Sequence, residues 1–357
     1  MSEGVRSLDR RLLLKWAAGA LGAAGVGAGV LATAGNAAGA VGTSQRFSLT
    51  DPSTELFREI DLQETRVLQS FSFDNTNKHL YVVSLVDGGR QLPGESRRYT
   101  GDERARYGDL CVTRLDWHGS IIGRMYLKGF GHGVSIAAEP AGNSAWLWTE
   151  TDSVEAANPS YPTDPTKNIG WGSRIGRFKF SNGAVLTPTS SKLTKFSPVA
   201  GADRTTIAVD PANNRLAVRY RLAGTFQFGL YDLAAFKAGT FTQLAHVTQP
   251  TVLASDFQGF TSYGQYLYLL EGKAYSSTNP APGNTYHTVI DWNTGSVAER
   301  RLTEAGASLP FREPEGLAIQ IPDTATPTAV RLCTGFASGA DAGSPKQASF
   351  YYKDALV

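Results

Sequence analysis

The ten residues VDPANNRLAV at positions 209–218 decide how the rest of the chain is interpreted. An apolar strand-like run leads into Asp210 and Pro211, two asparagines follow, and apolar residues then alternate with other residues from Arg215 onward. Asp, Pro and Asn supply the side-chain acceptors and the left-handed backbone of a tight turn, and a period of two is typical of a half-buried strand. The stretch therefore predicts a strand, an acidic turn and a second strand.

Segments of the same kind occur earlier in the chain, as FDNTNKHLYV at 73–82 and AEPAGNSAWL at 138–147, spaced 65 and 71 residues apart. Two later units, at 258–270 and 315–321, complete a series of five, and hairpin signals at 181–184 and 291–295 fall where the outer strands of a blade would turn. The series predicts an all-β protein, a single five-bladed β-propeller of four-stranded antiparallel blades closed by its terminal segments. A pair of β-sandwiches is the alternative, because the repeats are degenerate.

Composition and charge exclude several classes of protein. The chain has 357 residues with 34 Lys plus Arg against 32 Asp plus Glu, and without the four basic and two acidic residues before position 41 the balance is 30 against 30. A neutral body gives no electrostatic footprint for nucleic acid. Two cysteines, Cys111 and Cys333, exclude a disulfide-stapled miniprotein. No cofactor or metal motif is apparent, and we expect a monomer.

The N-terminal residues read as an export signal. Arg10 and Arg11 stand directly before an apolar, glycine-rich segment at 16–34, an arrangement that resembles a twin-arginine signal. Small residues at 38–40 are acceptable to signal peptidase, which predicts cleavage near Ala40. We therefore expect a signal peptide at 1–40, an N-terminal extension at 41–59 and a propeller at 60–357, secreted by the twin-arginine export machinery. An uncleaved signal that anchors the protein in the membrane is the alternative.

A polar residue followed by a small one recurs where each innermost strand would begin. The instances are Gln69-Ser70, His132-Gly133, Gln258-Gly259 and Glu315-Gly316, and the third blade offers Asp203-Arg204-Thr205. Innermost strands line the central channel of a propeller, so we expect these polar side chains to converge at one mouth of the channel. A structural explanation stands beside this one, because small residues let the backbones crowd the axis and buried polar side chains can satisfy one another.

Two long inserts interrupt the repeats, at 88–108 with Arg97 and Arg98, and at 152–171 with Tyr161 and Trp171. Long loops on a rigid scaffold often carry function, although solvated decoration is as good an explanation. Aromatic side chains near turns can stack on sugars, which makes Trp117, Trp171 and Trp292 candidates, whereas Trp146 and Trp148 alternate in a strand and are expected to pack between blades. The predicted ligand-binding residues are Gln69, His132, Arg204, Gln258, Glu315, Trp171 and Tyr161.

The sequence GFGHGVSIAAE at 129–139, followed by WLWT at 146–149, resembles a known β-propeller family, and the segments at 258–260 and 313–317 are similar to its later blades. The family comprises teichoic acid biosynthesis protein C-like proteins and the propellers of phage tail receptor-binding proteins. The resemblance implies a five-bladed propeller and a partner that is a cell-wall glycopolymer or another cell-surface polysaccharide. It brings no catalytic motif.

The sequence favours an exported propeller that binds such a glycopolymer at its channel mouth, with Arg204 available to pair with a carboxylate or phosphate. The alternative is an exported carbohydrate-active enzyme that uses the same residues. A glycoside hydrolase would need two carboxylates, for which Glu315 and Asp203 are the candidates. A polysaccharide lyase would use His132 or a tyrosine as the base while Arg204 neutralised a uronate.

Overall fold

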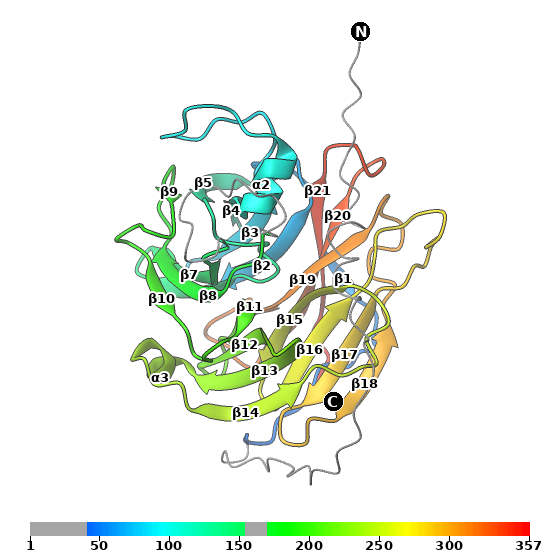
Figure 1. Ribbon diagram of the computed structural model, residues 1–357. Coiled ribbons are helices and arrows are strands. Elements are labelled where there is room, and N and C mark those ends of the chain that lie inside the picture. Colours follow the sequence, from blue (N-terminus) through cyan, green and yellow to red (C-terminus); the bar gives the residue numbers. More distant parts are fainter. Residues whose placement is uncertain (1–40, 154–169) are drawn as a thin grey trace, which may run out of the picture.

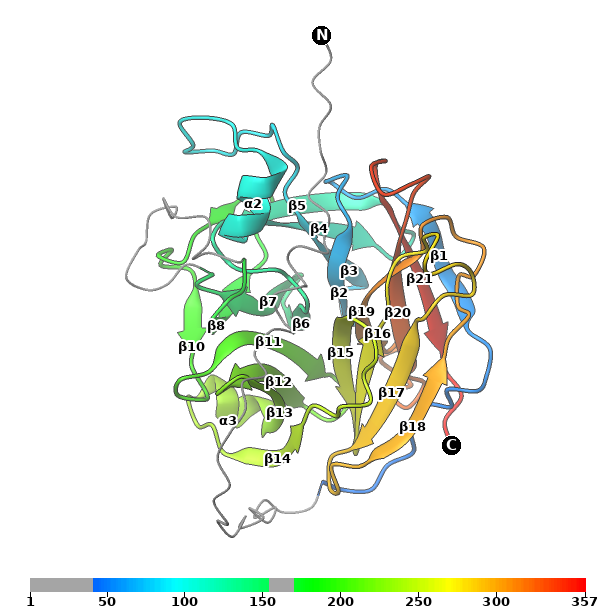
Figure 2. The ribbon, with the colours of Figure 1, turned by 45° about the vertical axis from the view of Figure 1, so that its right-hand side comes forward.

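The computed structural model describes residues 41–153 and 170–357, which form five sheets around a central axis (Figures 1 and 2). From the axis outward, blade 1 contains β2 (Leu68–Asp74), β3 (His79–Leu85), β4 (Leu110–Asp116) and β5 (Ile121–Leu127). Blade 2 contains β6 (Ala137–Ala141), β7 (Ser144–Thr151), β8 (Arg174–Lys179) and β10 (Thr194–Phe196). Blade 3 contains β11 (Asp203–Asp210), β12 (Arg215–Leu222), β13 (Thr225–Asp232) and β14 (Gln243–Thr248).

Blade 4 contains β15 (Phe257–Tyr263), β16 (Tyr266–Glu271), β17 (Tyr286–Asp291) and β18 (Val297–Leu302). Blade 5 contains β19 (Glu313–Gln320), β20 (Arg331–Ser338), β21 (Gln347–Lys353) and, as its outermost strand, β1 (Thr54–Ile60). The prediction of a five-bladed propeller with four-stranded antiparallel blades is confirmed.

The acidic turns act as the sequence predicts. Asp210 accepts hydrogen bonds from the backbone N–H groups of Ala212 and Asn213, which hold the turn between β11 and β12. Its other carboxylate oxygen accepts the N–H of Gly264 in the next blade, at 2.8 Å. The same side chain therefore shapes a hairpin and joins two blades.

Apolar side chains fill the space between neighbouring blades, and there are five such clusters because the ring has five junctions. Trp148 packs with Phe196 and Phe236 between blades 2 and 3, as expected. Trp292 is fully buried between blades 3 and 4, and its indole Nε1 donates to Ser262 Oγ at 3.0 Å. The prediction that Trp292 is a surface aromatic is therefore wrong, because its turn folds back onto the core.

The ring is closed by a strand from the N-terminal side. Strand β1 lies beside β21 in Figure 2, with Thr54 opposite Tyr352 and Ile60 opposite Ala348. An isolated bridge between Phe47 and Leu356 extends the contact. The propeller therefore begins before residue 60, and residues 54–59 are not an extension outside it. The last repeat carries only three strands, so its outer edge needs a partner from elsewhere in the chain.

Other local predictions were also wrong. Strand β9 (Val185–Leu186) pairs in parallel with β5 of blade 1, so the turn at 181–184 leads into the neighbouring blade instead of the outer strand of blade 2. Helix α2 (Gly101–Tyr107), with a capping box of Thr100 and Glu103, lies in the first insert and was not predicted. Helix α3 (Leu233–Lys237) follows β13, and the Asp232 side chain caps its N-terminus.

The cysteines Cys111 and Cys333 are buried and free. Within residues 41–153 and 170–357, no helix is long and apolar enough to span a membrane. The predicted export signal at 1–40 and the candidate Tyr161 lie outside the described residues.

Candidate functional site at the channel mouth

The small residues of the recurring polar-small pairs meet at the axis. Because every blade repeats the same up-and-down order, the five innermost strands begin at the same end of the channel. A Cβ added to Gly259 would lie 2.7 Å from Gly316 Cα, and one added to Gly316 would lie 3.0 Å from Ser70 Cα. The Ser70 hydroxyl donates to the carbonyl of Gly133 at 2.6 Å. The small residues therefore have a structural role, which is to close a narrow ring.

Three of the polar residues in these pairs are buried beside that ring. Gln69 donates from Nε2 to the carbonyls of Val67 and Leu68, and Gln258 donates from Nε2 to the carbonyl of Gly272 at 3.0 Å. Glu315 is 2% exposed. The two glutamines support the backbone where the blades crowd together, and the burial of all three side chains assigns them to the wall of the channel more than to its open rim.

The structure brings together three of the other predicted residues. The rings of His132 and Trp171 stack, with centroids 4.8 Å apart and planes 23° apart. The Arg204 guanidinium carbon lies 5.3 Å from the Trp171 ring centroid. All three side chains are partly exposed. Residues from two loops of blade 2 and the first strand of blade 3 therefore form one aromatic and cationic surface at the mouth.

Arg204 reaches this position through an irregularity in its strand. The register between β11 and β12 shifts between Asp203 and Thr206, and Arg204 has a φ of 51°, in the left-handed region. A bulge of this kind re-aims a side chain that a regular strand would leave in the pleat. Residues in this backbone region are uncommon outside glycine and often mark functional sites.

Glu150 lies beneath the stack and fixes both loops that carry it. Its carboxylate accepts the backbone N–H of Gly133 at 2.7 Å and that of Gly172 at 2.5 Å, next to His132 and Trp171 respectively. Burial raises the pKa of Glu150 to about 7, against the opposing effect of these backbone hydrogen bonds. Glu150 was not predicted. The available signal was an acidic residue in the otherwise apolar and neutral run of β7.

Arg219 is a second residue that the sequence analysis missed. It is 3% exposed, and its guanidinium carbon lies 3.7 Å from the ring centroid of Phe226 and 3.8 Å from that of Phe257. Its Nε donates to Gln249 Oε1 at 2.9 Å. Cation–π contacts on both sides hold the guanidinium plane in a fixed orientation. The available signal was an arginine in a strand where Ala217, Val218 and Tyr220 are buried.

Asp203 forms an ion pair with Arg221. Its two carboxylate oxygens accept hydrogen bonds from Arg221 Nε at 2.8 Å and Arg221 Nη2 at 2.5 Å. This bidentate pair leaves Arg204, the residue next to Asp203, to face Trp171.

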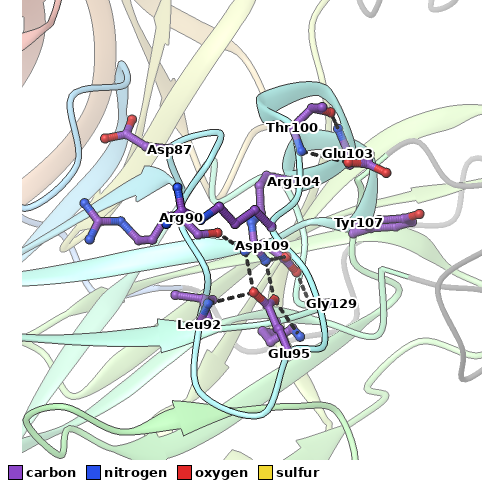
Figure 3. Close-up of polar contacts among 12 residues, drawn as sticks. Asp87, Arg90, Leu92, Glu95, Thr100, Glu103, Arg104, Tyr107, Asp109 and Gly129 are labelled. Carbon is purple, nitrogen blue, oxygen red and sulfur yellow. Dashed lines mark hydrogen bonds and ion pairs between the residues drawn. The ribbon is translucent and has the colours of Figure 1, made fainter.

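The first insert is built around a buried arginine. Arg104 donates to Glu95 and Asp109 at 2.6 and 2.7 Å from Nη1, and to Glu95 at 2.6 Å from Nη2 (Figure 3). Although burial alone would raise the pKa of Glu95, hydrogen bonds from Arg104 and Lys128 lower it to about 2. Arg97 pairs with Glu103 at 2.6 Å on the exposed side of α2. The insert is therefore an ion-paired structural unit.

The remaining candidates lie elsewhere. Trp117 is in the turn between β4 and β5, at the opposite end of blade 1, with Lys78 Nζ 5.8 Å from its ring centroid. In the part of the chain that the structure describes, no group of three or more His, Cys, Asp or Glu side chains is placed to hold a metal ion.

The fold and this mouth define a β-propeller with an aromatic and cationic rim. The chain matches the family described as "Phage 5-bladed beta propeller receptor binding platform domain" over residues 67–344, and it belongs to that family. The predicted resemblance is thereby confirmed.

One curated relative is "Putative major teichoic acid biosynthesis protein C" from Bacillus subtilis (strain 168), which is 29% identical over 307 residues. The match covers 82% of this chain but only 61% of the relative. Among solved structures, the tail fiber of Staphylococcus aureus phage P68 has the same fold, with a TM-score of 0.64 and 18% identity over 86% of this chain and 54% of that chain. A family 43 arabinoxylan arabinofuranohydrolase from Bacillus subtilis aligns with a TM-score of 0.41, which is too distant to bear on activity.

Proposed function

We propose that the protein is an exported propeller that binds a cell-wall or cell-surface glycopolymer at its channel mouth. The observation that carries the proposal is the stack of His132, Trp171 and Arg204. An aromatic face suits the apolar face of a sugar ring, and a guanidinium suits an anionic substituent on the same polymer. The names of the relatives, which refer to receptor binding and to teichoic acid, agree with this class of ligand.

Binding explains these residues better than catalysis does. A glycoside hydrolase needs two carboxylates with access to water. Of the two candidates, Asp203 is bound by Arg221 and Glu315 is only 2% exposed. Neither Gln69 nor Gln258 needs a ligand to explain its buried amide. A site that orients a sugar without attacking it requires only the rim residues.

The direct test is co-sedimentation of the purified protein with cell walls before and after chemical removal of their anionic glycopolymers. We expect binding to the intact walls and a clear loss after extraction. Trp171→Ala should weaken binding, whereas Trp117→Ala, a tryptophan at the opposite end of blade 1, should not. Equal binding to intact and extracted walls would contradict the proposal.

The enzymatic alternative gives a different result in the same preparation. A hydrolase would release reducing ends, and a lyase would produce absorbance from a new double bond. His132→Ala and Glu315→Gln, singly and together, would then abolish product formation. If the protein is a binder, no product appears, and His132→Ala lowers affinity with little change in thermal unfolding.

Export is part of the proposal and rests on Arg10 and Arg11 in the sequence. Replacing both arginines with lysine should retain the precursor in the cytoplasm, and N-terminal sequencing of the exported protein should begin near Val41. Normal export of the double variant, blocked only when the general secretory route is inhibited, would contradict the twin-arginine route.

A further inference from the structure

Two guanidinium groups at the channel mouth have no carboxylate within ion-pair distance in the described part of the chain. Among the described residues, neither Arg204 nor Arg219 forms an ion pair within 4.0 Å, and Arg204 Nε is buried with no hydrogen-bond partner. The hydrogen bond of Arg219 goes to the neutral amide of Gln249. Burying a charge without a counter-charge is costly, so the arrangement calls for an explanation.

Buried arginines elsewhere in the protein are satisfied differently. Arg104 is enclosed by two carboxylates. Arg312 is fully buried, but its guanidinium donates to the carbonyls of Ala305 and Thr303 and to the hydroxyl of Thr285. The terminal nitrogens of these two structural arginines meet carboxylates, backbone carbonyls or a hydroxyl, and Arg204 and Arg219 differ from that pattern.

The two guanidinium groups also repel each other electrostatically. Burial lowers the pKa of Arg204, and the neighbouring charge of Arg221 lowers it further, while Asp203 opposes both effects. Burial lowers the pKa of Arg219, and the charge of Arg204 adds to that effect, while Glu150 opposes it. Arg204 and Arg219 are thus near enough to interact electrostatically, and a bound anion would relieve the repulsion.

Unused hydrogen-bond donors lie next to these groups on β11. The hydroxyls of Thr205 and Thr206 are buried, and no partner is found for either among the described residues. Thr206 is directly opposite Arg219 in the register of β11 and β12, so their side chains share one face of the sheet. Guanidinium and hydroxyl donors together are the groups that bind oxyanions in proteins.

We propose that Arg204 and Arg219 form a subsite for one oxyanion of the glycopolymer, a phosphodiester or a carboxylate, beside the sugar that stacks on Trp171. The Phe226–Phe257 sandwich holds the Arg219 fork in place before the ligand arrives, so little side-chain entropy is lost on binding. This inference rests on the proposed function and specifies that the ligand is an anionic glycopolymer.

Thermal unfolding of the full-length mature protein, with sodium phosphate titrated against sodium chloride at equal ionic strength, tests the subsite. Phosphate should raise the melting temperature of the wild type by a few degrees, because a ligand that binds only the folded state stabilises it. Arg204→Gln and Arg219→Met should lose most of that shift. The matched control is Arg331→Met. Like Arg219, Arg331 packs on an aromatic ring, with its guanidinium carbon 4.0 Å from the centroid of Tyr352, and donates to a glutamine, Gln320. It should retain the shift.

Titrations with two anionic polymers identify the anion and distinguish a failure of this inference from a failure of the proposed function. Poly(glycerol phosphate) and polygalacturonate are titrated into wild type, Arg219→Met and Arg331→Met by calorimetry, and we expect about a tenfold loss of affinity for one polymer in Arg219→Met only. The polymer whose affinity falls identifies the anion as a phosphodiester or a carboxylate. If a glycopolymer binds but both arginine variants bind it as the wild type does, the subsite is refuted and the proposed function stands. If phosphate shifts the wild type through these arginines but no glycopolymer binds, the proposed function fails and the anion site stands. Equal effects of phosphate and chloride on the wild type would refute the anion site itself.

Discussion

Arginines in two regions at the same end of the propeller have opposite electrostatic surroundings. In the insert of blade 1, Arg104 is enclosed by Glu95 and Asp109, and all three side chains are fully buried (Figure 3). At the mouth of blade 3, Arg204 and Arg219 pack against aromatic rings with no carboxylate in ion-pair distance among the described residues. The first arrangement holds a loop together, and the second leaves positive charge for something that is not part of the fold.

The pKa values of the buried acidic residues in the two regions are shifted in opposite directions. Hydrogen bonds from Arg104 and Lys128 lower the pKa of Glu95 to about 2, although burial opposes them. In contrast, burial raises the pKa of Glu150 to about 7, although backbone N–H groups oppose it. An acid is kept ionised where charges are paired and is driven toward its neutral form where they are not.

The largest expected effect comes from breaking the paired region. Arg104→Met should lower the free energy of unfolding by about 3–5 kcal/mol, because it removes the buried cation that pairs with both Glu95 and Asp109 and leaves Lys128 beside Glu95. Urea denaturation at neutral pH measures the loss. Arg97→Met is the control, because the exposed pair of Arg97 and Glu103 should contribute little to stability. Similar losses in both variants would remove the basis of the comparison.

The second expected effect is a pH dependence that originates at Glu150. Its pKa is raised in the folded state, from 4.5 to about 7, so the folded protein binds more protons than the unfolded chain between these values. The corresponding stability is fully present below about pH 4.5 and is lost as pH rises through about 7, on the order of 3 kcal/mol in total. Unfolding measured from pH 4.5 to 8 should show this decline in the wild type and a flatter profile in Glu150→Gln. An unchanged slope in the variant would show that another group titrates.

A smaller effect of the opposite sign is expected at the unpaired region. Arg219→Met removes a buried charge and places a flexible apolar side chain between Phe226 and Phe257. Replacing an unpaired buried charge by a packed apolar group should raise the free energy of unfolding by about 1 kcal/mol. Thermal and urea unfolding in chloride buffer measure it. A loss of stability comparable to that of Arg104→Met would mean that Arg219 holds the fold, as Arg104 does.

The smallest expected effect on stability is that of Trp171→Ala. The side chain is partly exposed on a loop, so the free energy of unfolding should change by less than about 1 kcal/mol. Affinity for the glycopolymer should nevertheless fall about tenfold, because a stacked aromatic contact contributes roughly 0.5–1.5 kcal/mol. Calorimetric titration beside Trp117→Ala separates the two effects. A variant that loses stability and keeps affinity would assign Trp171 to packing.

The recurrence of acidic turns was enough to predict the blades, because each hairpin is specified by residues within about ten positions of one another. Closure by the terminal segments was expected, but β1 could not be identified in this way as the strand that completes the last blade. Its partner β21 lies almost 300 residues further along the chain, and the exposed, weakly patterned run TELFREI does not identify its neighbour. The short helix α2 was missed for a related reason, since it is stabilised by the capping box and by burial of Arg104 more than by an apolar stripe.

The candidate site, like the fold, was predicted from the sequence only in part. The sequence by itself determined the five-bladed class, the innermost strands and the placement of His132 and Arg204 near one mouth, because these follow from local periodicity and repeat order. Only the tertiary structure decided which polar residues are wall and which are rim, and it added Glu150 and Arg219. Burial and charge pairing depend on contacts between blades, as where Arg219 of blade 3 meets Phe257 of blade 4, and no local pattern specifies whether a guanidinium finds a carboxylate there.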